Sequence, residues 1–204
     1  MRPMEPHLHN PTSPSNFTGS ILVAVPTLID PHFRRSILFI TRHEKEEGAF
    51  GVILNRPCGQ TLGECSDPPE QLRDVPVFEG GPVEREQLLL ARIQLMEKEE
   101  EEGDDRARFE SLDRDEAELF EAQLEGNDCP PTGFRAFAGY AGWTSGQLER
   151  EIEEKSWLIL PPTKPLLLPV ETLEEGIARW RGIMKELGSW YRLLAEAPDD
   201  LSLN

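Results

Sequence analysis

The residues with the clearest chemical potential lie between Gly142 and Gly146, where the sequence reads Gly-Trp-Thr-Ser-Gly. This is a threonine version of the Gly-x-Ser-x-Gly nucleophile elbow, and the flanking residues predict the strand, turn and helix that such a motif needs. A hydroxyl nucleophile also requires a general base within hydrogen-bond reach. His43 is the only histidine outside the N-terminal tail and the Asp30 turn, and nothing in the sequence places it beside Thr144. The sequence therefore supplies no assembled catalytic set.

Thr144 also has a structural interpretation as the N-cap of a helix. The hydroxyl of an N-cap threonine accepts from a backbone N–H three residues on, and Gln147 occupies the position that reciprocates in a capping box. Trp143 and Leu148 complete a hydrophobic staple. We therefore predict a helix that begins at Ser145 and runs to about residue 155, and we favour capping over catalysis for Thr144.

Ligand binding without catalysis is a second hypothesis for the same helix start. Its backbone N–H groups and the positive end of its dipole could hold a phosphate or carboxylate. Gly139 and Gly142 precede it, and Arg35, Arg56 or Arg135 could assist. Close packing of backbone against backbone explains the glycines equally well. The pattern is neither a Walker A motif nor a dinucleotide fingerprint, so we predict no cofactor.

Other polar residues sit at strand boundaries, where a side chain either fixes a turn or lines a cleft. We favour Asp30 as the cap of a turn and Arg35 as the partner of an acid. Gly80 and Gly81 mark a sharp turn. The full set of possible ligand-binding residues is Asp30, Arg35, His43, Asn55, Gly80, Gly81, Gly139, Gly142, Trp143, Thr144, Ser145 and Gln147.

Histidine and cysteine usage does not predict a metal site. His7 and His9 form a pair in the N-terminal tail, whereas His32 and His43 lack carboxylate or thiolate companions at a recognisable spacing. The three cysteines include no Cys-x-x-Cys pair, which favours a reducing compartment. Two of them, Cys58 and Cys65, could meet on oxidation, but ordinary small side chains are the favoured interpretation.

Charge excludes some partners. The 204 residues are 38% hydrophobic, enough to bury a substantial core, and carry a formal net charge of -17. Such a field repels phosphate, and the nearest approaches to a basic cluster are Arg34 with Arg35 and Arg179 with Arg181. No segment has the roughly 20 apolar residues of a membrane span. We therefore expect a cytoplasmic protein that binds neither nucleic acid nor membrane.

The chain reads as one domain with extensions. The polar, proline-rich residues 1–16 are predicted to be a disordered tail, and 17–188 to form the domain. Within it, the acidic run 97–105 is predicted to be a solvated loop rather than a calcium site, and whether it is ordered or binds a cation stays open. Residues 113–125 have a helical pattern.

Hydrophobic runs predict the elements of the domain. Buried strands are expected at 20–25, 36–41, 49–54, 75–78 and 156–160, the second and third pairing as a hairpin, with a further short strand in LLLPV at 166–170. A capping box of Thr172 and Glu175 opens a closing helix that ends at Gly188. Residues 189–204 form a helical extension, whose Trp190 and Tyr191 either cover the sheet or present a docking face.

Four ordered blocks resemble the YqgE/AlgH family of bacterial proteins, from about Phe17 to Gly188. They are GSILVAVPTLIDPHFRRSILFI, GAFGVILNRP, GGPV and GYAGWTSGQLE, followed by SWL and a closing helix with Trp180. The resemblance implies a compact α+β domain with a curved mixed sheet or partial barrel flanked by helices. It implies no known reaction, and the label of transcriptional regulator attached to some members finds no helix-turn-helix or basic face here.

The preferred functional interpretation is a non-enzymatic regulatory or partner-binding module. An unidentified protein partner would bind the C-terminal aromatic helix. The alternatives are a small-anion or phosphometabolite binder, a hydrolase that uses the turn around Thr144, and a transcriptional regulator by family label alone.

Overall fold

Hydrogen-bonded strands dominate the computed structural model, which describes residues 16–95, 107–112 and 133–197. Within these residues nine strands form one sheet in the order β4-β5-β8-β3-β2-β1-β9, with β6 paired to β8 and β7 paired to β6. The strands are β1 (Ile21–Ala24), β2 (Ile37–Glu44), β3 (Gly48–Ile53), β4 (Pro57–Thr61), β5 (Pro76–Glu79), β6 (Val83–Leu95), β7 (Ala107–Leu112), β8 (Phe134–Trp143) and β9 (Trp157–Leu160). The strands expected at 20–25, 36–41, 49–54, 75–78 and 156–160 are therefore confirmed as β1, β2, β3, β5 and β9, and so is the hairpin of β2 with β3.

The sheet is mixed and curls at β8. Among the described strands, only β5 and β8 pair in parallel, and the remaining pairs are antiparallel. The first part of β8 bonds to β5 and β6, whereas residues 141–143 bond to β3. The change of partner follows Gly139, whose φ is 71°. The result is a half-barrel in a single α+β domain, as the family resemblance implied.

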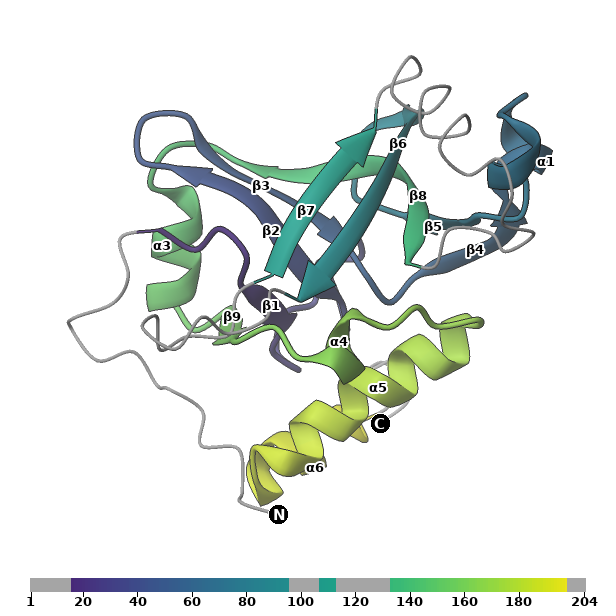
Figure 1. Ribbon diagram of the computed structural model, residues 1–204. Helices are drawn as coiled ribbons and strands as arrows, with labels where there is room; N and C mark the ends of the chain where they lie inside the picture. The colour runs from purple at the N-terminus through teal and green to yellow at the C-terminus, as the bar shows by residue number, and fades with distance from the viewer. Residues whose placement is uncertain (1–15, 96–106, 113–132, 198–204) are drawn as a thin grey trace, which may run out of the picture.

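Helices cover the sheet on different sides (Figure 1). Their bounds are α1 (Leu62–Cys65), a short 3₁₀ helix η1 (Glu70–Leu72), α3 (Gln147–Glu153), α4 (Lys164–Leu167), α5 (Leu173–Glu186) and α6 (Ser189–Ala195). Alternate residues of β2 belong to two cores: Ile37 and Phe39 pack with Trp180 of α5, and Leu38 and Ile40 with Leu148 of α3. This alternation fixes which helix lies on which face.

Two expected elements differ from the structure. The LLLPV segment is not a strand, because Leu166 and Leu167 belong to α4, where both backbone N–H groups donate to the Thr163 carbonyl at 3.0 and 3.1 Å. Pro165 lies in the first turn of α4, where its fixed φ suits a helix and its missing N–H costs nothing. Helix α3 begins at Gln147 rather than Ser145, because Gly146 precedes it in the left-handed conformation.

The closing helix matches its prediction at the cap and in most of its stripe. The Thr172 hydroxyl accepts from the Glu175 N–H at 3.2 Å, but the Glu175 carboxylate accepts from Glu171 N–H instead of completing the box. Trp180 and Met184 are fully buried. Leu173, expected in the same apolar stripe, is 53% exposed because it lies in the first turn of α5.

Some predicted features fall on residues that the structure does not describe. Residues 1–15, the acidic run 97–105 and the helical pattern at 113–125 are outside. None of the described helices is both long and apolar enough to cross a bilayer.

Candidate functional site

The turn at Thr144 forms a closed set of hydrogen bonds. Gln147 Oε1 accepts from the Thr144 N–H at 3.0 Å and lies 3.2 Å from the Thr144 hydroxyl, while the Ser145 hydroxyl donates to the Lys45 carbonyl at 2.6 Å. Thr144 therefore does not cap the helix with its own oxygen. Gln147 supplies the reciprocal half of the predicted capping box alone.

His43 lies closer to this turn than the sequence suggested, but both of its ring nitrogens are engaged. Nδ1 accepts from the Phe17 N–H at 3.0 Å, so Nε2 carries the proton of the neutral ring and donates to Glu149 at 3.1 Å. The side chain is 2% exposed and stacks on Phe17. A base with no free nitrogen gives the hydrolase hypothesis no support.

The acidic residues of α3 also make its N-terminus unfavourable for binding an anion. Glu151 accepts from the indole N–H of Trp143 at 2.9 Å and of Trp157 at 2.8 Å, and its other oxygen accepts from Gln147. With Glu149 on the same helix, the local field is negative. Trp143 is buried and acts in this network as a structural donor.

Three of the four predicted glycines lie where the backbone packs too closely for a side chain, and the fourth does not. A Cβ on Gly80 would lie 2.0 Å from the Gly139 carbonyl oxygen, and one on Gly81 would lie 2.2 Å from the Tyr140 carbonyl carbon. Gly139 has a positive φ, and a Cβ there would lie 2.5 Å from the Val83 carbonyl oxygen. At Gly142 an added Cβ would meet only the Tyr140 ring at 3.5 Å. Three of the four glycines thus join β8 to the turn before β6.

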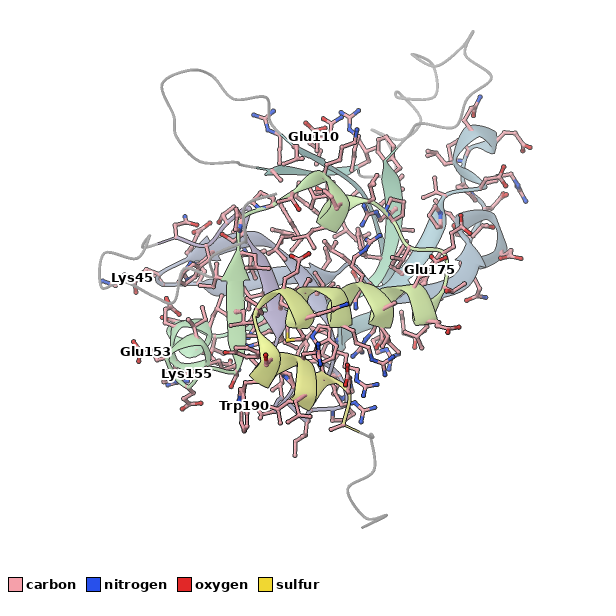
Figure 2. All side chains as sticks on the ribbon, turned by 90° about the horizontal axis from the view of Figure 1, so that it is seen from below. Lys45, Glu110, Glu153, Lys155, Glu175 and Trp190 are labelled. Carbon is pink, nitrogen blue, oxygen red and sulfur yellow. The ribbon has the colours of Figure 1, made fainter. Side chains whose placement is uncertain are left out.

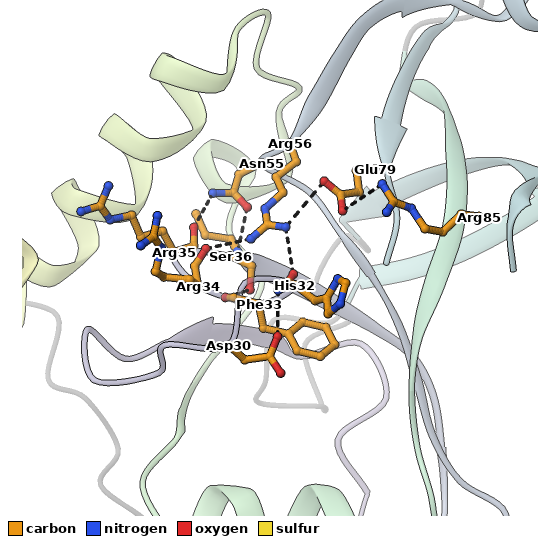
Figure 3. Close-up of polar contacts among 11 residues, drawn as sticks. Asp30, His32, Phe33, Arg34, Arg35, Ser36, Asn55, Arg56, Glu79 and Arg85 are labelled. Atoms are coloured by element: carbon orange, nitrogen blue, oxygen red, sulfur yellow. Dashed lines mark hydrogen bonds and ion pairs between the residues drawn. The ribbon is translucent and has the colours of Figure 1, made fainter. Parts of the chain in front are cut away.

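A second polar cluster gathers around the turn after β1 (Figure 3). Asp30 Oδ1 accepts from the His32 N–H at 2.8 Å, and the Asp30 carbonyl accepts from Phe33 and Arg34 at 3.0 and 2.7 Å. The predicted role of Asp30 as the cap of a turn is confirmed. This single helical turn brings the 32–34 carbonyls towards the end of β3.

Arg56 holds this turn from the outside. Its two terminal nitrogens donate to the carbonyls of His32 and Arg34, both at 2.8 Å. The same guanidinium lies 3.6 Å from a Glu79 carboxylate oxygen, whose partner oxygen lies 3.6 Å from Arg85. Two arginines therefore share one carboxylate, a chain of charges that Figure 3 shows in one line.

Asn55 holds the turn from the inside. It is 2% exposed, accepts from the Ile37 N–H at 2.8 Å, and donates to the carbonyls of Arg35 and Gly176 at 2.9 and 3.0 Å. Arg35 has a φ of 59° and places its guanidinium 5.9 Å from the centre of the Trp180 ring. Asn55 thus ties β2, the turn and α5 together with every polar atom of its amide.

Sequence reasoning missed several members of these networks. Glu149, Glu151, Glu79 and Arg85 carried no motif, because their partners are set by strand register and helix packing. One signal was readable: Glu79 immediately precedes the Gly80-Gly81 pair. Its N–H bonds to the Arg56 carbonyl at 2.9 Å, which brings the two charges together.

In the described part of the chain, the cysteines form no reactive thiol site and the possible metal ligands form no metal site. Cys58 and Cys65 are free and exposed, and partial burial, with Glu79 next in effect, raises the pKa of the Cys58 thiol. A raised pKa leaves less of the reactive thiolate. The described residues contain no group of three or more His, Cys, Asp or Glu that could hold a metal ion.

Similarity to known proteins extends over nearly the whole chain. A family model described as AlgH-like matches residues 21–192. A UPF0301 protein of Thermobifida fusca is 33% identical over 202 residues, covering 93% of this chain and 96% of that protein. A UPF0301 protein of Streptomyces coelicolor is 34% identical over 202 residues, covering 95% and 98%.

Solved structures share the fold. A crystal structure of a Corynebacterium diphtheriae protein superposes with a TM-score of 0.63 at 23% identity, covering 91% of this chain and 93% of that one. The solution structure of AlgH from Pseudomonas aeruginosa superposes with a TM-score of 0.59 at 25% identity, covering 91% and 96%. The chain therefore belongs to the AlgH-like family, the YqgE/AlgH proteins also named UPF0301.

Proposed function

We propose that the protein is a non-enzymatic binding module that docks an acidic protein partner on α6. The observation that carries this proposal is the exposure of two large apolar side chains on a short helix. Trp190 is 68% and Leu193 64% exposed, and Figure 2 shows Trp190 directed away from the rest of the molecule. Three residues apart, they share one face of α6.

The opposite face of α6 already has a partner. Ala195 is 2% exposed and belongs to the main core, and Tyr191 packs against that core. The apolar residues of α6 therefore exceed what its attachment to the domain uses. Exposed aromatic residues that the fold does not require are typical of interaction surfaces, where tryptophan contributes more binding energy than most residues.

Charge selects the chemistry of the partner. Helices α5 and α6 together contain Arg179, Arg181, Lys185 and Arg192 against Glu174, Glu175 and Glu186, four minus three, giving +1 within a chain of -17. A pair of helices with a small positive charge and two exposed apolar side chains complements an acidic surface with an apolar pocket for an indole. A regulatory role would be exerted through this contact. The apolar pair favours a protein over a nucleic acid as the partner.

The test compares Trp190→Ala and Leu193→Ser with Ile29→Ser. Ile29 is 79% exposed on the turn after β1 and serves as the matched control. Proteins captured by the wild-type chain from its source cells are identified by quantitative mass spectrometry, purified and measured by calorimetry against each variant. We expect Trp190→Ala to weaken the affinity of the partner by roughly 30-fold and Ile29→Ser to leave it unchanged.

Three results would overturn the proposal. One is a purified partner that binds Trp190→Ala as tightly as the wild type. Another is a homodimer that Trp190→Ala converts to a monomer in light scattering, which assigns α6 to self-association. The third is capture of nucleic acid alone, lost with Arg181→Glu but not with Trp190→Ala.

A further inference from the structure

Arg135 is a cation buried inside the main core. It lies on β8 directly opposite Ala91 of β6 and is 2% exposed. Its guanidinium stands 5.6 Å from the centre of the Phe78 ring, on the sheet face that α4 covers. Arginine is almost never fully buried unless it is paired, because removing an ion from water is costly.

The hydrogen bonds of Arg135 are incomplete. Nη2 donates to the Leu167 carbonyl, whereas Nε and Nη1 have no hydrogen-bond partner among the described residues. Each unpaired donor in a buried position costs free energy comparable to a lost charged hydrogen bond. The site is therefore short of acceptors.

A second arginine makes the shortage more severe. Arg179 of α5 donates to the carbonyls of Leu168 and Pro169, so the two guanidinium groups bind three successive carbonyls, from the last residue of α4 to Pro169. Burial, with the charge of Arg179 next in effect, lowers the pKa of Arg135 to about 10. Burial also lowers the pKa of Arg179, and the charge of the nearby Glu175 partly opposes this shift by raising the pKa.

Glu175 does not supply the missing acceptor. One of its oxygens accepts from the Glu171 N–H at 2.8 Å, and its charge bears on Arg179 rather than on Arg135. Two neighbouring cations whose donors exceed the acceptors offered by the described residues match the requirements of an oxyanion. Guanidinium groups bind carboxylate and phosphate oxygens more strongly than neutral acceptors.

We propose that Arg135 and Arg179 form an internal binding site for a small oxyanion, a carboxylate or a phosphate, beneath the segment Leu168–Glu171. That segment is the point of entry, since Leu168 is 49% exposed and Pro169 is also exposed at the surface. Displacing it opens a path to Arg135 and frees the carbonyls that the two arginines now use. The proposed site uses neither the exposed pair Trp190 and Leu193 of α6 nor the turn at Thr144.

The experiment measures Tm of the full chain against inorganic phosphate and, separately, citrate, each titrated into chloride buffer at constant ionic strength. We expect one of the two anions to raise Tm saturably, with half-saturation below about 1 mM and a rise of about 5–10 °C at 100 times Kd. Arg135→Met should abolish this rise and Arg179→Gln should weaken it. Arg85→Gln, which removes an exposed arginine paired with Glu79, should leave it unchanged.

The two anions distinguish the source of the ligand, because a phosphate-only response assigns a phosphoryl group and a citrate-only response a carboxylate. If Arg135→Met fails to fold, the phosphorus NMR linewidth of inorganic phosphate, or the carbon linewidth of citrate, is compared between wild type and Arg179→Gln. The proposal is overturned if neither anion changes Tm of the wild type. It is also overturned if the rise survives in Arg135→Met, since the anion then binds elsewhere.

Discussion

At the scale of single residues, buried polar side chains organise this protein by satisfying backbone groups. His43 and Asn55 are each 2% exposed, and their polar atoms bond to segments distant in the sequence. Neither side chain has a free donor or acceptor among the described contacts with which to begin a reaction. Their type was readable from the sequence, but their partners were not.

Asn55→Ala should therefore lower the free energy of unfolding by about 3 kcal/mol. The substitution leaves the Ile37 N–H and the Gly176 carbonyl buried without partners, and each such group costs about 1–3 kcal/mol. Urea unfolding followed by circular dichroism measures the change. Gln60→Ala, at an exposed position on β4, is the control with no expected effect. A loss under about 1 kcal/mol for Asn55→Ala would contradict the assigned role.

At the scale of elements, α5 shows how contact overrides intrinsic preference. Its two interior glycines lower helix propensity equally, but their surroundings differ. A Cβ on Gly176 would lie 1.9 Å from the Asn55 carbonyl oxygen, whereas one on Gly182 would meet nothing within 4 Å. Gly176 therefore sets how closely α5 approaches the end of β3.

The matched variants Gly176→Ala and Gly182→Ala should act in opposite directions. Gly182→Ala should raise the free energy of unfolding by about 0.5–1 kcal/mol, because alanine is the better helix former. Gly176→Ala should lower it by about 2 kcal/mol, because overpacking exceeds the gain in propensity. Both are measured by urea unfolding. Equal stabilisation by the two variants would show that α5 does not press on Asn55.

At the scale of the whole molecule, the formal net charge of -17 opposes compaction. Several of the described basic residues form ion pairs, such as Arg56 with Glu79 and Arg92 with Glu110. Ion pairs leave the overall excess of acidic residues in place. The repulsion among these acidic residues is screened by dissolved salt, which shortens its range.

Raising KCl from about 10 mM to about 0.3 M at neutral pH should therefore raise Tm. Screening of about 1 kcal/mol of repulsion corresponds to a rise of about 2–4 °C for a chain of this size. Differential scanning calorimetry measures it. Near the isoelectric point of about 4.6 the same titration should have a much smaller effect. A fall in Tm with salt at neutral pH would show that favourable ion pairs outweigh the net repulsion.

The sequence by itself determined the family, the α+β class, most strands and the helix that Thr172 caps. These features depend on local periodicity, turn chemistry and ordered motifs, which act between near neighbours. It did not determine the start of α3 or the helical state of α4. There a left-handed Gly146 and the Thr163 carbonyl decide the backbone path.

Only the tertiary structure decided which charges and donors meet. It placed His43 against Glu149, joined Arg56 to Glu79, and buried Arg135 with two donors unpaired among the described residues. It also left Trp190 exposed while Tyr191, the next residue, packs on the core. These outcomes depend on strand register and on helices docking across the sheet. Such long-range contacts have no local pattern in the sequence.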